Sequence, residues 1–171
     1  SLANPITDFI MPIITSFHYW LPLYIIGIAY LLLRYKLKGL YILIILLFVV
    51  GLCDLLNAQI IKEYFMRIRP CRALDNVHLL IHCGQGKSFP SNHAVNNFAA
   101  ATILSHYFKR KISIFFIIAG LISLSRVFVG VHYFGDILAG SLFGFLVASF
   151  FLILFSKLKY DKNVIEAIRI N

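Results

Sequence analysis

The sequence contains few charged residues. Asp, Glu, Lys and Arg make up 13% of its 171 residues, whereas hydrophobic residues make up 60%. Soluble domains carry roughly 25% charged residues. This chain has too few polar side chains to cover the surface of a globular domain. The composition therefore argues against a soluble cytosolic protein and predicts an integral membrane protein.

Coiled-coil heptads, low-complexity tracts and internal repeats are also absent from the sequence. A single domain over residues 1–171 is therefore sufficient. The N-terminal segment lacks the basic region and the small-residue cleavage site of a removable signal peptide. Residues 4–16 place Pro5 and Pro12 among apolar residues. This short, interrupted pattern predicts an interfacial helix rather than a membrane span.

Acidic residues are scarce relative to basic ones. Seven Asp and Glu residues against 16 Lys and Arg residues give a formal net charge of +9. Such a charge can indicate nucleic-acid binding, but here the basic residues occur in short clusters between apolar runs, as they do in membrane proteins. We therefore expect the lipid bilayer as the partner and no nucleic acid. No obligate protein partner is indicated.

Weakly charged runs alternate with short polar segments along the chain. A helix that crosses a bilayer needs about 17 to 25 mostly apolar residues and satisfies its own backbone hydrogen bonds. The sequence therefore predicts an all-α transmembrane bundle of about five spans. The third span contains several Asn, Ser and His residues and should be the one most enclosed by the others. The predicted spans are 17–33, 39–61, 91–108, 112–129 and 135–156.

The distribution of basic residues predicts an orientation. With five spans, segments 34–38 and 109–111 and the tail from residue 157 fall on one side of the membrane. That side carries ten of the 16 Lys and Arg residues, so the positive-inside rule assigns it to the cytoplasm. The polar segment 62–91 and the turn 130–134 would then face outward.

Unusual polar residues gather at the outward ends of the predicted spans. Lys62 and Arg69 are seven residues apart, so they share one face if the helix continues to Pro70. Ser91 is well placed as the N-cap of the next helix. The free N–H groups of a helix N-terminus favour an anion. These positions predict a site for a negatively charged group.

A pair of titratable residues lies near the start of the last span. His132 and Asp136 are four residues apart, so on a helix the carboxylate can orient the imidazole. Such a histidine is a credible nucleophile toward phosphorus. His93 could protonate a leaving alkoxide, and Arg126 adds a third cation for the charge of a phosphoryl group. We therefore predict phosphoryl transfer at this end of the molecule.

Other interpretations of these residues exist. Two histidines and one carboxylate could bind a metal ion, but the nearby cations would oppose a divalent ion. We therefore predict no metal and no other cofactor. Arg67, Arg72 and Lys87 are interpreted as residues of the lipid head-group region.

Three residues outside this constellation also stand out. Asp54 is an intramembrane carboxylate, which is costly, and lies about two turns from Lys62. We expect it to support the site through hydrogen bonds. Cys71 and Cys83 share the segment predicted to face an oxidising space, so a disulfide between them is a hypothesis.

Three motifs resemble the signature of the type 2 phosphatidic acid phosphatase superfamily. They occur in the family's order within residues 62–136. The one departure is Asn92, where the second motif most often has glycine. The motifs are K-x6-R-P (Lys62 to Pro70), P-S-x-H (Pro90 to His93) and S-R-x5-H-x3-D (Ser125 to Asp136).

The resemblance implies a role for each matching residue. His132 would form a phosphohistidine and Asp136 would orient it. His93 would act first as a general acid and then as a base. The family needs no metal. The phosphate oxygens would be bound by Lys62, Arg69, Ser91 and Arg126.

The resemblance also implies a multi-pass lipid phosphatase of a bacterial cytoplasmic membrane, with its active site toward the periplasm. We favour the 1-phosphate of lipid A as substrate, because the N-terminal segment and the compact basic loop suit a large anionic head group. Phosphatidylglycerophosphate, undecaprenyl pyrophosphate and phosphatidic acid are alternatives. A lipid-to-lipid phosphotransferase is a further alternative. From a different class, a transporter that only binds lipid phosphates is another.

Overall fold

The computed structural model describes residues 4–170, and every regular element in that range is a helix. The prediction of an all-α protein is confirmed. A π-helical stretch, η1, connects α3 to α4 without a break, and η2 is a short 3-10 turn. The elements are α1 (Pro5–Thr15), α2 (Phe17–Tyr35), α3 (Leu37–Leu56), η1 (Asn57–Ile61), α4 (Lys62–Phe65), α5 (Pro70–Ala73), α6 (Asn92–Tyr107), η2 (Lys109–Lys111), α7 (Ile112–Phe128), α8 (Phe134–Phe155) and α9 (Lys159–Ile170).

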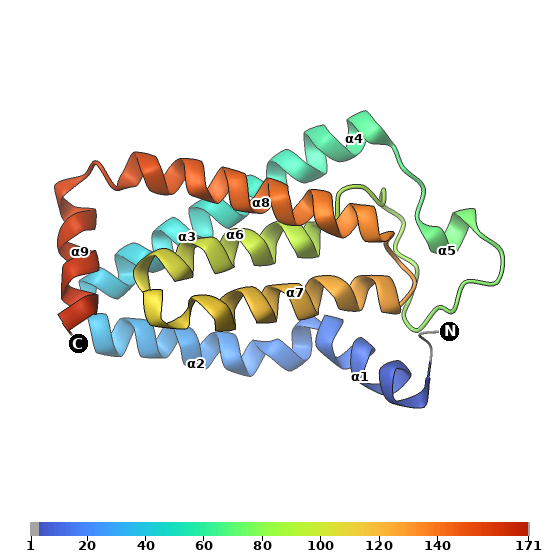
Figure 1. Cartoon of the computed structure of the whole chain (residues 1–171), viewed down its shortest axis with the longest axis horizontal. Helices are drawn as coiled ribbons and strands as arrows, with labels where there is room; N and C mark the ends of the chain where they lie inside the picture. The colour runs from blue at the N-terminus through green and yellow to red at the C-terminus, as the bar shows by residue number, and fades with distance from the viewer. Residues whose placement is uncertain (1–3, 171) are drawn as a thin grey trace.

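The long helices run side by side along one direction (Figure 1). Within residues 4–170, three helical segments are long and apolar enough to cross a bilayer: α2, the segment Leu37–Ala73 that begins with α3, and α8. Helix α7 is apolar but shorter, and α6 has 16 residues. A bundle with three membrane-length helices is therefore shown, and about five crossings remain the prediction.

Large apolar side chains face outward from these helices. Leu33 on α2 is 80% exposed, Leu47 on α3 is 64% exposed and Ile153 on α8 is 65% exposed. Burying such side chains away from water is worth roughly 1.5–3 kcal/mol each. Contiguous apolar surface of this kind marks a membrane-contacting face. The outer surface of the bundle therefore suits lipid acyl chains.

Helix α6 is the most enclosed helix of the bundle, as predicted from its polar composition. It packs against α3, α7 and α8. Two glycines of α8 permit the close approach: a Cβ atom at Gly140 would clash with the backbone oxygen of Ser91, and one at Gly144 would clash with that of Val95. The buried residues of α6 are Ala94, Val95, Ala99, Ala101, Thr102, Ile103, Ser105 and Tyr107.

One end of the bundle collects the connections between α2 and α3, α6 and α7, and α8 and α9, and α9 lies across it (Figure 1). Val164 and Ile168 bury the apolar face of α9. Asp161 is fully buried there and accepts a hydrogen bond from the hydroxyl of Tyr107 at 2.6 Å. The predicted grouping of the basic connections at one end is confirmed.

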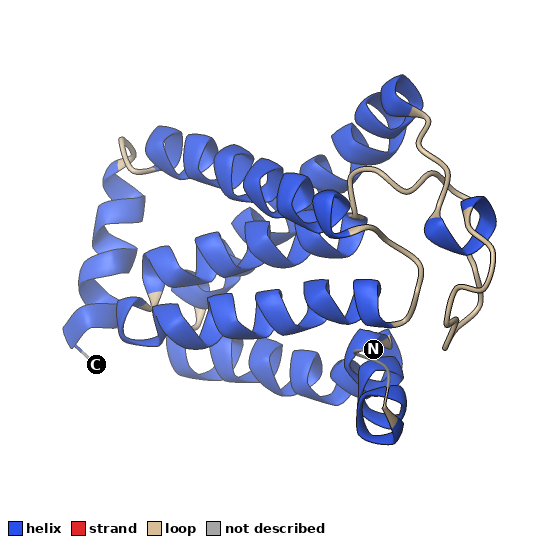
Figure 2. Cartoon of the chain, turned by 45° about the vertical axis from the view of Figure 1, so that its right-hand side comes forward, coloured by secondary structure: helices blue, strands red, loops and turns tan. Residues whose placement is uncertain are grey.

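The opposite end contains α1, α4, α5 and most of the chain without regular structure (Figures 1 and 2). Helix α1 lies within the predicted interfacial segment 4–16 and packs against α7. Its helical structure is confirmed, and its depth in a membrane stays a prediction. The polar residues singled out in the sequence lie at this end.

Candidate active site

A polar cavity of about 290 Å³ lies at this loop-rich end. Its walls come from α4, from the connection between α4 and α6, from the ends of α6 and α7 that face this side, and from the loop before α8. Five of the seven predicted site residues line it. Of the other two, Asp136 contacts His132 and Ser91 directly precedes Asn92. The lining residues are Lys62, Arg69, Gly86, Asn92, His93, Arg126 and His132.

The helix that carries Lys62 ends earlier than predicted. Helix α4 ends at Phe65 instead of continuing to Pro70. Met66 takes the left-handed conformation, with φ of 48°, that often terminates helices. Lys62 and Arg69 are therefore not on one face of a helix, and the prediction of a shared helical face is wrong.

The two cations nevertheless converge on the cavity, because both bind the same short segment of backbone. Lys62 Nζ donates a hydrogen bond to the carbonyl of Lys87 at 2.8 Å. Arg69 Nε donates to the carbonyl of Gly86 at 2.9 Å, and Arg69 Nη1 donates to the carbonyl of Val131 at 3.2 Å. The turn after α4 thus brings Lys62 and Arg69 to the same cavity, as a continuous helix was expected to do.

His132 and Asp136 contact each other across a helix N-terminus. His132 Nδ1 lies 3.3 Å from Asp136 Oδ2. His132 lies in the loop before α8, whereas Asp136 is the third residue of α8, so the pair does not lie within one helix as expected. The N–H of Tyr133 also donates to Asp136 Oδ2, at 2.9 Å. The carboxylate therefore holds both the imidazole and the start of α8.

Two further residues hold Asp136, and neither was expected from the sequence. Ser88 Oγ donates to Asp136 Oδ2 at 2.5 Å, and Arg67 Nη1 lies 3.0 Å from Asp136 Oδ1. The Arg67 guanidinium also lies over the ring of Tyr133, 4.0 Å from its centroid. Arg67 is thus an ion-pair partner of a buried carboxylate rather than a head-group residue, which corrects the prediction.

The contacts of His132 define its tautomer. Arg69 Nη1 lies 3.1 Å from His132 Nε2. A guanidinium only donates hydrogen bonds, so Nε2 must accept, and the ring proton is on Nδ1 facing Asp136. Burial lowers the pKa of His132 to about 4; the hydrogen bond to Asp136 raises the pKa, and the charges of Arg69 and Arg126 lower it. His132 is therefore neutral near pH 7, with its basic nitrogen toward the cavity.

Arg126 and His93 complete the wall. Arg126 lies in the last turn of α7, and its Nη1 donates to Thr15 Oγ1 at 2.6 Å. Its Nε is buried and has no hydrogen-bond partner among residues 4–170. His93 is the second residue of α6. The cavity is thus lined by the imidazole of His93 and the guanidinium of Arg126 in addition to His132.

Ser91 occupies the N-cap position of α6, as predicted, but its side chain makes no capping hydrogen bond. Its Oγ is buried and without a partner in the described part of the chain. Its backbone N–H donates to the carbonyl of Asp136 at 3.1 Å. Ser91 therefore ties α6 to α8, and its role in phosphate binding stays a prediction.

Cys71 and Cys83 form a disulfide with a Cα–Cα distance of 6.2 Å, which confirms the hypothesis. The bond links α5, which follows Arg69, to the segment that leads to Gly86. It therefore ties together the two stretches of chain that lead to Arg69 and to Gly86, the cation and the carbonyl that holds it.

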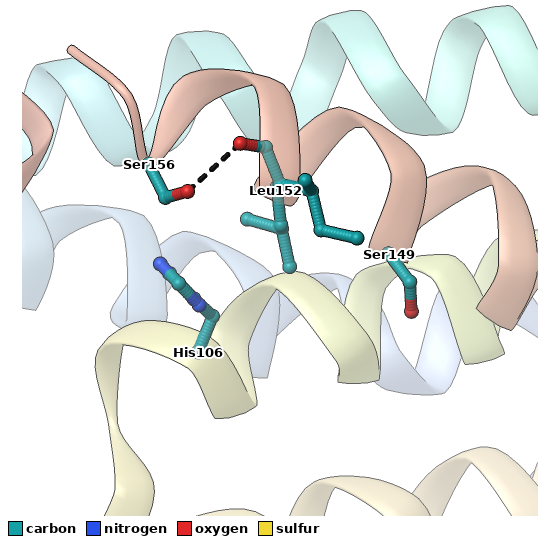
Figure 3. A pocket seen from close by; sticks show the side chains of 5 residues that line it. His106, Ser149, Leu152 and Ser156 are labelled. Atoms are coloured by element: carbon teal, nitrogen blue, oxygen red, sulfur yellow. Dashed lines mark hydrogen bonds between the residues drawn. The ribbon is translucent and has the colours of Figure 1, made fainter.

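A second cavity, of about 250 Å³, lies between α6 and α8 at the α9 end (Figure 3). Ser156 Oγ donates there to the carbonyl of Ile153 at 2.8 Å. It has one histidine and no Lys or Arg in its lining, so it does not offer the same chemistry. Its lining residues are His106, Ser149, Leu152, Ile153 and Ser156.

Residues 38–160 match the family model of the PAP2 superfamily. The chain belongs to the PAP2 superfamily. The resemblance drawn from the three motifs is confirmed, and so is the class of enzyme: PAP2 lipid phosphatases are metal-independent phosphomonoesterases.

Several curated relatives are phosphatases by name. The lipid A 4'-phosphatase of Bacteroides thetaiotaomicron is 31% identical over 153 residues, which cover 84% of this chain and 67% of that protein. The lipid A 4'-phosphatase of Porphyromonas gingivalis is 29% identical over 159 residues, with coverage of 87% and 66%. Phosphatidylglycerophosphatase B of Bacillus subtilis is 32% identical over 121 residues, with coverage of 64% and 55%. The chain spans about two thirds or less of the length of these relatives.

Two solved PAP2-type structures share the fold. The transmembrane phosphatidylglycerolphosphate phosphatase of Bacillus subtilis superposes with a TM-score of 0.70 at 30% identity, covering 92% of this chain and 81% of that chain. Aquifex aeolicus LpxE superposes with a TM-score of 0.69 at 28% identity, covering 88% of each chain. This PAP2 chain is therefore a multi-pass membrane protein.

The names of the relatives revise one expectation. Both lipid A phosphatases above are named for the 4'-phosphate and not for the 1-phosphate. The preference for the 1-phosphate of lipid A is therefore not supported.

Proposed function

We propose that the chain hydrolyses a phosphate monoester of a membrane lipid through a phosphohistidine on His132. The observation that carries this proposal is the setting of the imidazole. Nδ1 contacts Asp136, and Nε2 contacts Arg69 on the wall of a cavity that also presents Lys62 and His93. The lone pair on Nε2 accepts the contact from Arg69, and it becomes available to phosphorus when that guanidinium turns to the phosphate oxygens.

In the first step, His132 Nε2 attacks phosphorus, and the bond between phosphorus and the lipid oxygen breaks as the P–N bond forms. Protonated His93 donates its proton to the leaving alkoxide, which departs as the lipid alcohol. The positive charge that develops on the His132 ring is balanced by Asp136. Lys62, Arg69 and Arg126 stabilise the charge on the phosphoryl oxygens.

In the second step, a water molecule attacks the phosphohistidine. His93, now neutral, accepts a proton from that water as the P–O bond forms. The P–N bond breaks, inorganic phosphate leaves, and His132 returns to its neutral form. Both histidines thus return to their starting protonation states.

We propose lipid A as the first substrate class, with the 4'-phosphate as the expected position. The names of the two lipid A phosphatases among the relatives support this choice. Phosphatidylglycerophosphate is the second candidate, because a phosphatase named for it shares the fold over 92% of this chain. The orientation proposed from the basic residues places the α9 end in the cytoplasm and the cavity toward the periplasm.

The test is phosphate release by the purified protein in detergent with EDTA present. The substrates are lipid A phosphorylated at either position, phosphatidylglycerophosphate, undecaprenyl pyrophosphate and phosphatidic acid. We expect release from lipid A carrying the 4'-phosphate, and a loss of at least about a thousandfold in His132→Ala. His106→Ala is the matched control, because His106 lies at the opposite end of α6 and should leave activity unchanged.

Three other results would contradict the proposal. Transfer of the phosphoryl group to a second lipid without free phosphate would indicate a phosphotransferase. Binding of lipid phosphates without turnover would indicate a transporter or binding protein. Loss of activity with EDTA, restored by a divalent metal, would contradict the metal-independent mechanism.

A further inference from the structure

A network of amides and one carboxylate lies behind the cavity wall formed by Asn92. Asp54 Oδ1 accepts hydrogen bonds from Asn92 Nδ2 at 2.7 Å and from Asn96 Nδ2 at 2.9 Å. Asn57 Nδ2 donates to Asn92 Oδ1 at 2.9 Å and to the carbonyl of Pro90 at 3.3 Å. Both polar ends of the Asn92 side chain are therefore bonded away from the cavity that the residue lines.

The network joins two helical segments that each carry a lining residue of the cavity. Asp54 lies on α3, and Asn57 is the first residue of η1, five positions before Lys62. Asn92 is the first residue of α6 and directly precedes His93. A link between Asn57 and Asn92 therefore relates the position of the Lys62 ammonium to that of the His93 imidazole.

The energetics favour a network with a defined geometry. A carboxylate within a membrane helix is costly unless it finds partners. In the described part of the chain Asp54 forms no ion pair, and its partners are the amides of Asn92 and Asn96. Breaking one of these bonds would leave a partly buried polar group unpaired, and an unsatisfied group costs up to roughly 1–3 kcal/mol when it is fully buried. The network therefore resists displacement of α3 relative to α6.

The π-helical stretch η1 connects the linked residue Asn57 directly to Lys62. A π-helical turn differs in winding from an α-helix and often marks a functional site. The direction in which the Lys62 side chain points therefore depends on the conformation of η1, which directly precedes it. Asn57 begins that stretch and is fully buried, and its amide is fixed by Asn92 and Pro90.

We propose that Asp54, Asn57 and Asn92 are positioning residues that set the separation between Lys62 and His93 across the phosphate cavity. The inference rests on the proposed phosphatase function and deepens it. Asn92 stands where the related motif most often has glycine, which has no side chain to form this link. The link is therefore a feature of this chain and not of the motif.

The test is a double-mutant cycle on phosphate release, with kcat and KM determined separately and thermal unfolding measured for every variant. Asp54→Ala should lower kcat at least about tenfold while KM changes less than about threefold, because small misplacements of catalytic groups act on the chemical step. Asp54→Asn, which keeps an acceptor oxygen, should retain more of kcat. In an Asn92→Gly background, Asp54→Ala should cost less than about threefold, because the bond that connects Asp54 to the cavity wall through Asn92 is already absent, while Asn96 does not line the cavity.

Asp161→Asn is the matched control, because Asp161 is also a buried carboxylate bonded to a neighbouring side chain but lies at the other end. It should lower the unfolding temperature without changing kcat. The inference is overturned if the effects of Asp54→Ala and Asn92→Gly simply multiply, if Asp54→Ala leaves kcat unchanged, or if the loss of kcat only follows the loss of folded protein. An active wild type with any of these results leaves the proposed function standing, whereas an inactive wild type overturns both.

Discussion

At the scale of single residues, the proposed chemistry depends on the buried carboxylate of Asp136. It is fully buried, with Arg67 on one oxygen and Ser88 and His132 on the other. An unpaired charge in such surroundings costs several kcal/mol, so these partners keep the carboxylate ionised and fix its direction. His132 therefore faces an acceptor whose position is set by other residues.

Removing the Arg67 cation should change how strongly Asp136 acts on His132. In Arg67→Ala the negative charge of Asp136 is no longer shared with a cation, so we expect a higher pKa for His132. The carboxylate also loses a partner that fixes its direction, so we expect a fall of about tenfold in kcat/KM. Arg67→Lys should restore part of the activity. Arg72→Ala, in the same segment but bonded to the carbonyl of Gln85, should change kcat/KM less than about twofold. Equal losses in Arg67→Ala and Arg72→Ala would contradict this role.

The protonation of His132 predicts a pH dependence of stability. Its pKa in the folded protein is about 4, below the ordinary 6.5, so between these values the unfolded chain binds more protons than the folded one. His132 therefore contributes its full stabilisation above pH 6.5 and loses it as the pH falls toward 4. We expect the drop in unfolding temperature between pH 7.5 and pH 5 to be smaller in His132→Gln than in the wild type. An identical drop would show that His132 does not titrate in this way.

At the scale of elements, the connection between α4 and α6 supplies side chains and carbonyl groups of the site that do not lie on the long helices. It provides Arg67, Arg69 and Ser88 to the site and the carbonyls that hold two cations. A segment of this kind has little regular structure of its own, and its disulfide limits the conformations of the unfolded chain. Such a bond stabilises a closed loop of about 15 residues by roughly 3 kcal/mol.

The disulfide should be present in the membrane-embedded protein and report its orientation. We expect a maleimide reagent to label Cys71 and Cys83 in denatured samples only after reduction, because the segment faces an oxidising compartment. The experiment uses a Cys53→Ala background, since Cys53 is the remaining cysteine and is buried and free. Equal labelling with and without reductant would contradict both the bond and the proposed orientation.

At the scale of the whole molecule, the sequence predicted more of the helices than of their contacts. Long apolar runs determine where helices such as α2 and α8 form, because apolar length is a local property. The end of α4 could not be predicted, because no proline or glycine stands at Phe65 or Met66. The partners of Asp136 could not be predicted either. Arg67 and Ser88 lie 69 and 48 positions away from it, and no spacing rule connects residues so distant.

In the proposed mechanism, phosphate that enters the cavity takes the place of the carbonyl groups that hold Lys62 and Arg69. Each phosphate oxygen that enters replaces a neutral carbonyl of Lys87 or Gly86 with a charged oxygen, so the donors trade a weaker hydrogen bond for a stronger one. When inorganic phosphate departs, the same carbonyls again accept hydrogen bonds from Lys62 and Arg69. Neither cation is then left without an acceptor in partly apolar surroundings. On this proposal, a pocket lined by three cations can release its anionic product and begin another turnover.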